Sequence, residues 1–267
     1  MPLPLPVSLT PSKVASFKDC ALAFRFSAID RLPEPPSPWA TKGTLVHRAL
    51  ELLFCSPPAE RTLLTALACL SQARAEMASD PEYVGLALDA EAETRFAEEA
   101  EALVRRYFEL EDPTAVHPIG LELRLEVTVG SLVLRGVIDR LDLDADGGLV
   151  VTDYKTGKTP GVMAEQSRLG GVHFYAFLCQ QVLGRRPVRV QLLYLAEPVA
   201  IVAEPSDQSI RGLEVRAQAI WRAVERACER DDFRPHPSRL CDWCAFREFC
   251  PAFGGDPARA RELVATA

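Results

Sequence analysis

Apolar and polar residues alternate strictly along residues 119–129. Isoleucine, leucine and valine fill every odd position, whereas the even positions carry Gly, Glu, Arg, Glu and Thr. A period of two predicts a β-strand with one face on a core and the other in water. Glu122 and Glu126 belong to the polar face. They could approach a metal site, but surface charge is the interpretation we favour.

A second apolar pattern, RGVIDRLDLDADGGLVVTDYKTGK at residues 135–158, predicts a β-hairpin. Two arms rich in Val, Leu and Ile flank the turn residues DGG at 146–148, which tolerate positive φ. Because side chains alternate along a strand, Asp153 and Lys155 should share a face, and Asp139 joins them if it pairs opposite Lys155. Apolar residues on both faces of the arms predict helices packed on either side.

Helical periodicity accounts for most of the remaining chain. Residues 59–110 are alanine-rich and amphipathic, which predicts a helical insert with a break near Asp80 and Pro81. Gly43 should precede the helix that runs to about Phe54. Further helices are predicted over 13–26, 163–183 and 209–230, and strands over 189–196 and 200–203. The fold class is therefore α/β, with a central mixed, mostly antiparallel sheet flanked by helices in one domain, 1–267.

Composition and charge narrow the classes of function. The chain is 48% hydrophobic and 25% charged, with a net charge of −7. That charge argues mildly against a broad surface that coats nucleic acid, although a local basic groove remains compatible with it. No stretch of eighteen apolar residues is present, and the N-terminus lacks the pattern of a signal peptide. We therefore expect a cytoplasmic protein with no membrane partner.

Asp139, Asp153 and Lys155 carry the candidate chemistry. Two carboxylates and an ammonium at the end of an apolar hairpin are costly to bury unless an ion uses them. Metal-assisted phosphodiester hydrolysis uses such a trio: carboxylates bind Mg²⁺ or Mn²⁺, and a lysine positions water or stabilises developing charge. The plainer alternative is a surface ion pair of Asp139 with Arg140 beside an ordinary strand end.

The segments GVIDR and VTDYKTGK resemble the nuclease core of the RecB family, within the PD-(D/E)XK superfamily. The resemblance is also strong at residues 8–20, 39–50 and 241–251. It implies that His47, in a G-x-x-x-H arrangement, binds the metal together with Asp139 and Asp153, and that Lys155 is catalytic. The backbone carbonyl of Tyr154 is a further candidate ligand. A histidine ligand makes Mn²⁺ at least as suitable as Mg²⁺.

Two further roles concern residues around this core. Glu51, one helical turn after His47, either orients the imidazole or is a plain surface glutamate. Relatives commonly place Gln-x-x-x-Tyr in the helix after the hairpin, and Tyr175 matches the tyrosine, but Gly171 replaces the glutamine. Substrate contacts are therefore expected from Tyr175, Arg168, Lys158 and Arg140.

Four of the eight cysteines have metal-binding spacing. Cys241, Cys244 and Cys250 form C-x₂-C-x₅-C, and Cys20 would complete four thiolates. Such a set suits zinc or an iron–sulfur cluster, whereas disulfides are not expected in the cytosol. The resemblance to AddB-type nucleases implies a [4Fe–4S] cluster clamping residues 241–251 to Cys20, with Zn²⁺ as the alternative. Ala21 departs from the family, where proline more usually follows the cysteine.

These observations predict a metal-dependent DNA nuclease, most simply an exonuclease on single strands or DNA ends in repair or recombination. The chain has no G-x-x-x-x-G-K-[ST] phosphate loop, so any helicase would be a separate partner. The main alternative is a nuclease-dead or weakly active iron–sulfur subunit that binds DNA within a helicase–nuclease complex. A third hypothesis, from another class, is a zinc-clamped interaction protein.

Overall fold

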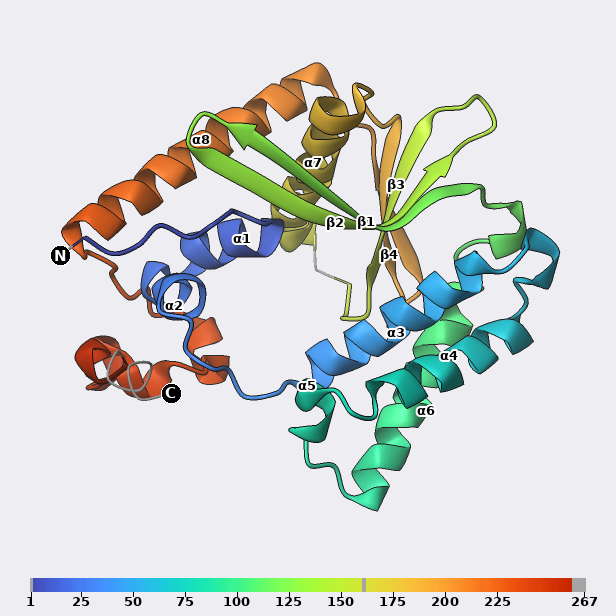
Figure 1. Ribbon diagram of the computed structural model, residues 1–267, viewed down its shortest axis with the longest axis horizontal. Coiled ribbons are helices and arrows are strands. Elements are labelled where there is room, and N and C mark those ends of the chain that lie inside the picture. The colour runs from blue at the N-terminus through green and yellow to red at the C-terminus, as the bar shows by residue number, and fades with distance from the viewer. Residues whose placement is uncertain (1, 160–161, 261–267) are drawn as a thin grey trace. The chain divides into compact units, whose positions relative to one another are not determined.

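The structure is a computed structural model that describes residues 2–159 and 162–260, with the backbone alone for 162–170. Its chain divides into two compact units (Figure 1). We call Pro36–Leu125 with Gly136–Ile210 the sheet unit, and Met1–Pro35 with Glu126–Arg135 and Arg211–Ala267 the cysteine unit. The single domain over 1–267 stays a prediction.

Five strands form one sheet in the order β1-β2-β3-β4-β5. β2 pairs with β3 and β4 with β5 in antiparallel orientation, whereas β3 and β4 are parallel. A parallel pair needs a crossover connection, and α7 supplies it. The predicted α/β fold with a mixed, mostly antiparallel sheet is confirmed. The strand bounds are β1 Pro118–Val129, β2 Leu132–Leu143, β3 Leu149–Lys155, β4 Arg189–Tyr194 and β5 Val199–Ala203.

The hairpin of β2 and β3 is present. Arg140 lies opposite Thr152, so Asp139 does not pair opposite Lys155, but the same register keeps Asp139 on the face that Asp153 and Lys155 share, as predicted. The side chain of Asp144 fixes the turn, because its Oδ1 accepts hydrogen bonds from the backbone N–H groups of Asp146 (3.0 Å) and Gly148 (2.6 Å). Gly147 has a φ of +75°, a conformation that favours glycine.

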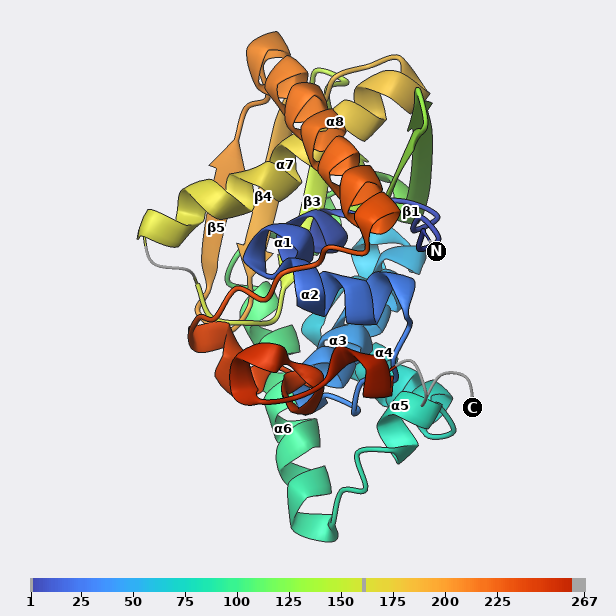
Figure 2. The ribbon, with the colours of Figure 1, turned by 90° about the vertical axis from the view of Figure 1, so that its left-hand side faces the viewer.

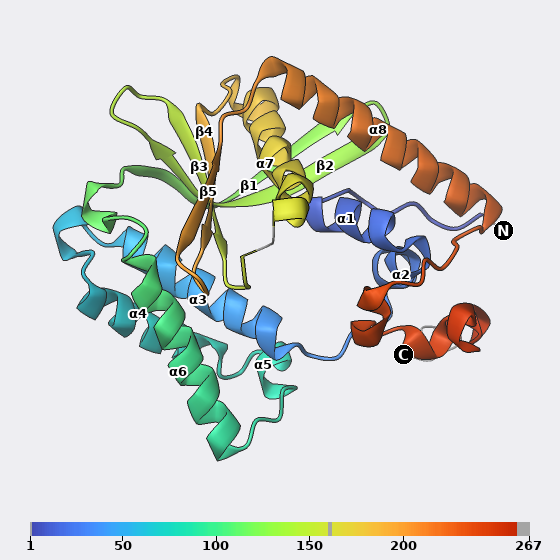
Figure 3. The same cartoon turned by 180° about the vertical axis from the view of Figure 1, so that it is seen from behind.

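The helices predicted over residues 59–110 are present, and their role as an insert stays a prediction. α4, α5 and α6 follow α3, and α3, α4 and α6 contact one another around a core of leucine, alanine and aromatic side chains that also includes Tyr154 and Leu193 from the sheet. α7 contacts β4 (Figure 3). No described helix is long and apolar enough to cross a bilayer. The bounds are α3 Pro38–Cys55, α4 Leu63–Met77, α5 Pro81–Val84, α6 Ala90–Tyr107 and α7 Val162–Leu183, with 3₁₀ turns at Pro58–Glu60 and Pro113–Ala115.

Gly43 does not end or begin a helix, contrary to the prediction. α3 starts at Pro38, where the Ser37 hydroxyl caps it by accepting the Ala40 N–H at 3.4 Å. A Cβ atom at position 43 would lie 3.1 Å from the hydroxyl of Thr156, just after β3. Glycine therefore lets α3 approach the end of β3 closely, and His47 follows one turn later on the same helix.

The cysteine unit contains α1 Pro11–Asp19, α2 Ala21–Phe24, a π-helical turn at Arg25–Ile29 and most of α8 Asp207–Arg230 (Figure 2). The single helix predicted over 13–26 is interrupted at Cys20, whose backbone is extended. Three 3₁₀ turns follow α8, at Arg239–Trp243, Arg247–Phe249 and Pro251–Phe253. Phe26 packs against Phe246 and Phe249, with ring centroids 5.5 and 6.2 Å apart, so aromatic contacts join early and late segments of this unit.

Candidate metal centre

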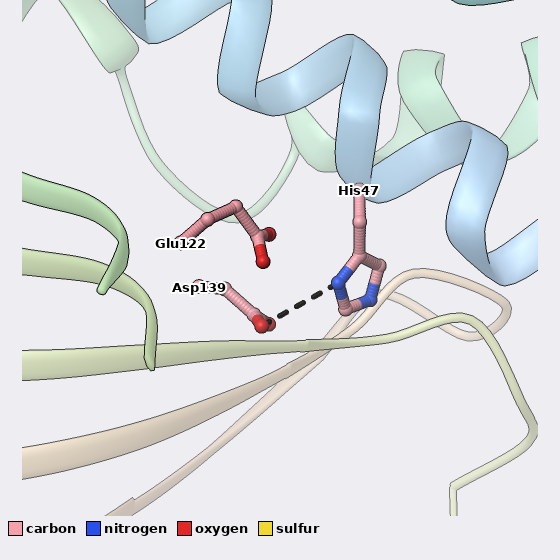
Figure 4. Close-up of side chains that lie close together, drawn as sticks. All are labelled: His47, Glu122 and Asp139. Carbon is pink, nitrogen blue, oxygen red and sulfur yellow. Dashed lines mark ion pairs between the residues drawn. The ribbon is translucent and has the colours of Figure 1, made fainter. Parts of the chain in front are cut away.

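Three side chains from three elements converge in the sheet unit: His47 of α3, Glu122 of β1 and Asp139 of β2 (Figure 4). Each offers one ligand atom, and these atoms all lie within 4.8 Å of one another. Carboxylate oxygens are the ligands that Mg²⁺ and Mn²⁺ prefer, and the imidazole makes the set at least as suitable for Mn²⁺. The residues present therefore fit the divalent cation expected from the sequence.

The imidazole of His47 lies between two acceptors. Its Nδ1 is 3.5 Å from an Asp139 oxygen, and its Nε2 is 3.1 Å from the backbone carbonyl oxygen of Tyr154. Burial of the ring opposes its charging, but the Asp139 carboxylate outweighs burial and raises the pKa of His47 above its usual 6.5. A cation at this position would compete with the imidazole proton. The predicted Tyr154 carbonyl thus lies at the site and contacts the histidine.

Asp139 and Asp153 are both almost completely buried. One oxygen of Asp139 accepts the Tyr154 backbone N–H at 2.6 Å. Asp153 is 3% exposed and lies outside the group of three, although the charges of Asp139 and His47 both reach it. Burial raises the pKa of Asp153, and Asp139 raises it further, whereas Lys155 opposes both. The ammonium of Lys155 is 2.5 Å from the Asp153 carboxylate, so the two share a face as predicted.

Glu122 is the site residue that the sequence interpretation missed. Its backbone has a φ of +44°, so the regular alternation of β1 is broken there, and its carboxylate points toward Asp139 and His47 (Figure 4). Burial and the Asp139 charge raise its pKa, while His47 lowers it. The surface interpretation is wrong for Glu122 and correct for Glu126, which is exposed. Nothing in the sequence indicates positive φ at a glutamate.

Arg140 is completely buried, so the prediction that it binds substrate is wrong. Its guanidinium lies under the sheet and stacks on Phe54, with Cζ 4.4 Å from the ring centroid. It donates to the hydroxyl of Tyr154 at 2.7 Å and to both oxygens of Asp142 at 2.8 and 2.9 Å. Its remaining acceptors are Glu111, Thr152 and Tyr107. Arg140 therefore anchors the ring of Tyr154, whose backbone contacts Asp139 and His47.

The other predicted contact residues have different surroundings. The hydroxyl of Tyr175 donates to Asp153 at 3.2 Å, so this side chain is coupled to a predicted metal ligand. Lys158 is exposed, and the side chain of Arg168 lies outside the described residues. Glu51 accepts a hydrogen bond from Arg48 at 2.8 Å, and no contact to His47 is found among the described residues. The role of Glu51 in orienting the imidazole is therefore not supported.

The four predicted cluster cysteines line one cavity of about 500 Å³ in the cysteine unit. Burial raises the pKa of the Cys244 thiol, and Cys20, Cys241 and Cys250 each raise it further. Within the described chain, however, these sulfur atoms do not form a group within 4.8 Å of one another. The spacing of a single zinc ion is thus not present, and the [4Fe–4S] cluster stays a prediction.

The chain is similar to known proteins in sequence and in fold. Residues 8–251 match the family model described as the PD-(D/E)XK nuclease superfamily. A crystal structure of a candidate exonuclease from Eubacterium rectale is similar, with a TM-score of 0.55 and 11% identity over 89% of this chain and 86% of that chain. The structure of SSO0001 has a TM-score of 0.36 and 17% identity, over 79% and 84% of the two chains. No curated protein matches the sequence. At 11% identity, the first likeness shows a shared fold.

Proposed function

Because the chain belongs to the PD-(D/E)XK nuclease superfamily, whose reaction is phosphodiester hydrolysis, we propose that it is a metal-dependent deoxyribonuclease. We further propose that it is a RecB-family exonuclease that acts on single strands or DNA ends in repair or recombination. The observation that carries the proposal is the convergence of His47, Glu122 and Asp139 beside the pair of Asp153 and Lys155. Candidate partners are DNA and a separate helicase.

In this proposal His47, Glu122, Asp139 and Asp153 hold Mn²⁺ or Mg²⁺, with the Tyr154 carbonyl as a further candidate. The bound cation would polarise the phosphate and acidify a water molecule. Asp139 is held toward the site by the Tyr154 N–H, which leaves its other oxygen facing His47. Two carboxylates and an imidazole that already lie together need little rearrangement to bind an ion, which favours catalysis by a fixed geometry.

Lys155 is the proposed catalytic lysine. Its side chain is about one-third exposed, whereas its partner Asp153 is buried, so the ammonium is at the accessible side of the pair. A charged ammonium has no lone pair and therefore does not coordinate a metal. It would orient the attacking water or stabilise the negative charge that develops on the phosphate.

End-labelled DNA tests the proposal. The purified chain is incubated with matched single-stranded DNA, duplex DNA and RNA in Mn²⁺, Mg²⁺ or EDTA, and an Asp139→Asn preparation serves as the control for contaminating nucleases. We expect short products released from single-stranded DNA ends in Mn²⁺ and none in EDTA. Binding to DNA without cleavage in either metal would favour the alternative of a nuclease-dead subunit. The intact set of candidate ligands argues against that alternative.

We also propose a [4Fe–4S] cluster at Cys20, Cys241, Cys244 and Cys250. The support is that all four thiols line one cavity, and that a four-iron cluster separates its thiolates more widely than a single ion does. Protein purified without oxygen should be brown, with absorbance near about 400 nm. Cys244→Ser should remove the colour, whereas Cys55→Ser, at an exposed cysteine of the sheet unit, should not. Colourless protein with stoichiometric zinc would contradict the cluster.

A further inference from the structure

Trp39 is a large aromatic side chain left in solvent beside the candidate metal centre. It is 74% exposed, although tryptophan is usually well buried. It lies at the start of α3 and lines a cavity of about 590 Å³ whose walls also include His47 and Glu122. An exposed indole and two candidate metal ligands thus face the same space within the sheet unit.

The indole is held in place from one side. The ammonium of Lys42 lies 4.5 Å from the centroid of the Trp39 ring, at the distance of a cation–π contact. Lys42 is itself only 6% exposed and forms an ion pair with Glu99. A buried, paired lysine fixes its ammonium, which in turn restricts the ring. Trp39 therefore presents a rigid aromatic surface to solvent, and a ligand that stacks on it would restrict the side chain little further.

Arg124 supplies a positive charge to the same cavity. Its side chain is exposed, and among the residues that the structure describes it forms no ion pair. The other arginine of the cavity, Arg48, is already bonded to Glu51 and Glu76 at 2.8 Å each. Glu122 also lines the cavity, and the charge of Arg124 lowers its pKa, but the Glu122 carboxylate is directed to His47 and Asp139 and forms no ion pair with Arg124 among the described residues. Arg124 is thus the guanidinium available to an incoming anion.

An aromatic surface and an unpaired guanidinium next to a metal centre match the chemistry of a single nucleic-acid strand. Unpaired bases stack on aromatic rings, and arginines bind the phosphates between them. In a duplex the bases stack on one another and their faces are not available. Along α3, Trp39 and His47 are eight residues apart, which corresponds to about 12 Å. A base on Trp39 would therefore belong to a nucleotide beside the phosphate that is cut.

We propose that Trp39 and Arg124 form a binding subsite for one unpaired nucleotide next to the scissile phosphate. The base stacks on the open face of Trp39, and a phosphate of the same strand pairs with Arg124. This inference rests on the proposed nuclease function and names its preferred substrate, a strand that is unpaired at the site.

Binding in EDTA tests the subsite without cleavage. Fluorescein-labelled oligo(dT) and a blunt duplex of equal length are titrated with the full chain, and anisotropy and tryptophan fluorescence are recorded. We expect Trp39→Ala to weaken binding of the single strand about tenfold or more, as for other stacking residues, and to remove most of the fluorescence quenching. Trp39→Phe should restore part of the affinity. Leu64→Ala is the control, because Leu64 is 80% exposed on α4 of the same unit and does not line the cavity.

Arg124→Gln provides a second, independent test, since an exposed arginine can be replaced with little risk to folding. It should weaken binding and reduce the magnitude of the slope of log affinity against log salt concentration by about one, which corresponds to the loss of one phosphate contact. Unchanged binding in both Trp39→Ala and Arg124→Gln, an equal loss in Leu64→Ala, or equal affinity for the duplex would overturn the subsite.

Cleavage in Mn²⁺ is measured separately on the same variants. If the unaltered chain cleaves DNA while Trp39→Ala binds and cleaves normally, the subsite is refuted and the nuclease function stands. If binding depends on Trp39 but no metal supports cleavage, the subsite stands and the nuclease function is refuted.

Discussion

The two groups of candidate metal ligands differ in what holds their side chains. In the sheet unit, the ligands come from a long helix and two strands, and His47 and Asp139 are both bonded to the backbone of Tyr154. In the cysteine unit, the thiols lie at the break between α1 and α2 and in or next to 3₁₀ turns, where they accept backbone hydrogen bonds such as that from the His236 N–H at 3.4 Å. Regular structure fixes the first group, and short turns carry the second.

This difference has an energetic meaning. Burial raises the pKa of Glu122 and of Asp153, and the nearby Asp139 charge raises both further, so the fold holds carboxylates whose charged forms are disfavoured. A bound cation would offset the repulsion among these carboxylates. Because the ligands already lie together, the site needs little rearrangement to bind it. The thiols are more dispersed, so binding of a cluster would also have to order the turns that carry them. We therefore expect metal to act on activity in the sheet unit and on folding in the cysteine unit.

The largest expected effect is that of Asp139→Asn. The amide can still accept the Tyr154 N–H, but its charge beside His47 is gone, so cleavage should fall about 10³-fold or more and Mn²⁺ binding should be lost. Asp146→Asn in the exposed hairpin turn is the matched control. Calorimetry and single-turnover cleavage measure the two effects. An active Asp139→Asn protein would mean that the converged group is not the metal centre.

Lys155→Ala should have the next largest effect, about 10²-fold in kcat. Mn²⁺ should still bind, and more tightly, because the ammonium 2.5 Å from Asp153 no longer repels the cation. Lys155→Arg, which keeps the charge, should retain part of the activity. Near-normal turnover in Lys155→Ala would preserve the metal centre and refute the role of the lysine.

Two buried arginines stack on the ring of Phe54, and comparing them isolates a smaller effect, that of Arg140 on metal binding. Arg140 and Arg61 both stack on this ring, at 4.4 and 5.1 Å, but within the described part of the chain Arg61 donates only to backbone carbonyls, including that of Val116 at 2.9 Å. Arg140→Met should destabilise the protein by about 3 kcal/mol, because it leaves the buried carboxylate of Asp142 without its partner. Arg61→Met should cost about 1–3 kcal/mol, because it leaves backbone carbonyls without a donor. Only Arg140→Met should weaken Mn²⁺ binding, about tenfold, because it frees the ring of Tyr154. Equal metal affinity in both would refute a positioning role for Arg140.

The smallest effect is a pH dependence of thermal stability. The folded-state pKa values of His47, Glu122 and Asp153 are all raised, so the folded state holds these protons more tightly than the unfolded state. Without divalent metal, their contribution to stability is present at low pH and is lost as the pH rises through those values. Saturating Mn²⁺ should therefore raise the Tm more at pH 8 than at pH 6, by about 5 °C. A shift independent of pH would contradict the raised pKa values.

Sequence patterns predicted most elements of this fold because period and turn residues act locally. The strand β1, the hairpin and the helices over 59–110 are all present. The exact register of β2 on β3 and the break at Cys20 were not predicted. The start of α3 was also missed, although its signals are local: Ser37 caps the helix and Pro38 occupies its first position. The errors at the site come from contacts between residues that are distant in sequence. Arg140 looked like a surface arginine because its partner Glu111 is far away in sequence, and Glu122 looked like an ordinary member of a polar face.

The left-handed backbone at Glu122 lowers stability, whereas the Glu122 side chain supplies a candidate metal ligand, so selection for stability and selection for metal binding act in opposite directions at this position. A residue with a side chain costs of order 1 kcal/mol or more in this conformation, and glycine would relieve it. Glycine would also remove a carboxylate that is repelled by Asp139. Selection for heat resistance alone therefore favours losing this side chain, whereas selection for a third metal-binding group retains it. In relatives that no longer bind the cation, we therefore expect position 122 to change first. Thermostable variants should be checked for loss of the Glu122 side chain before they are used as active enzymes.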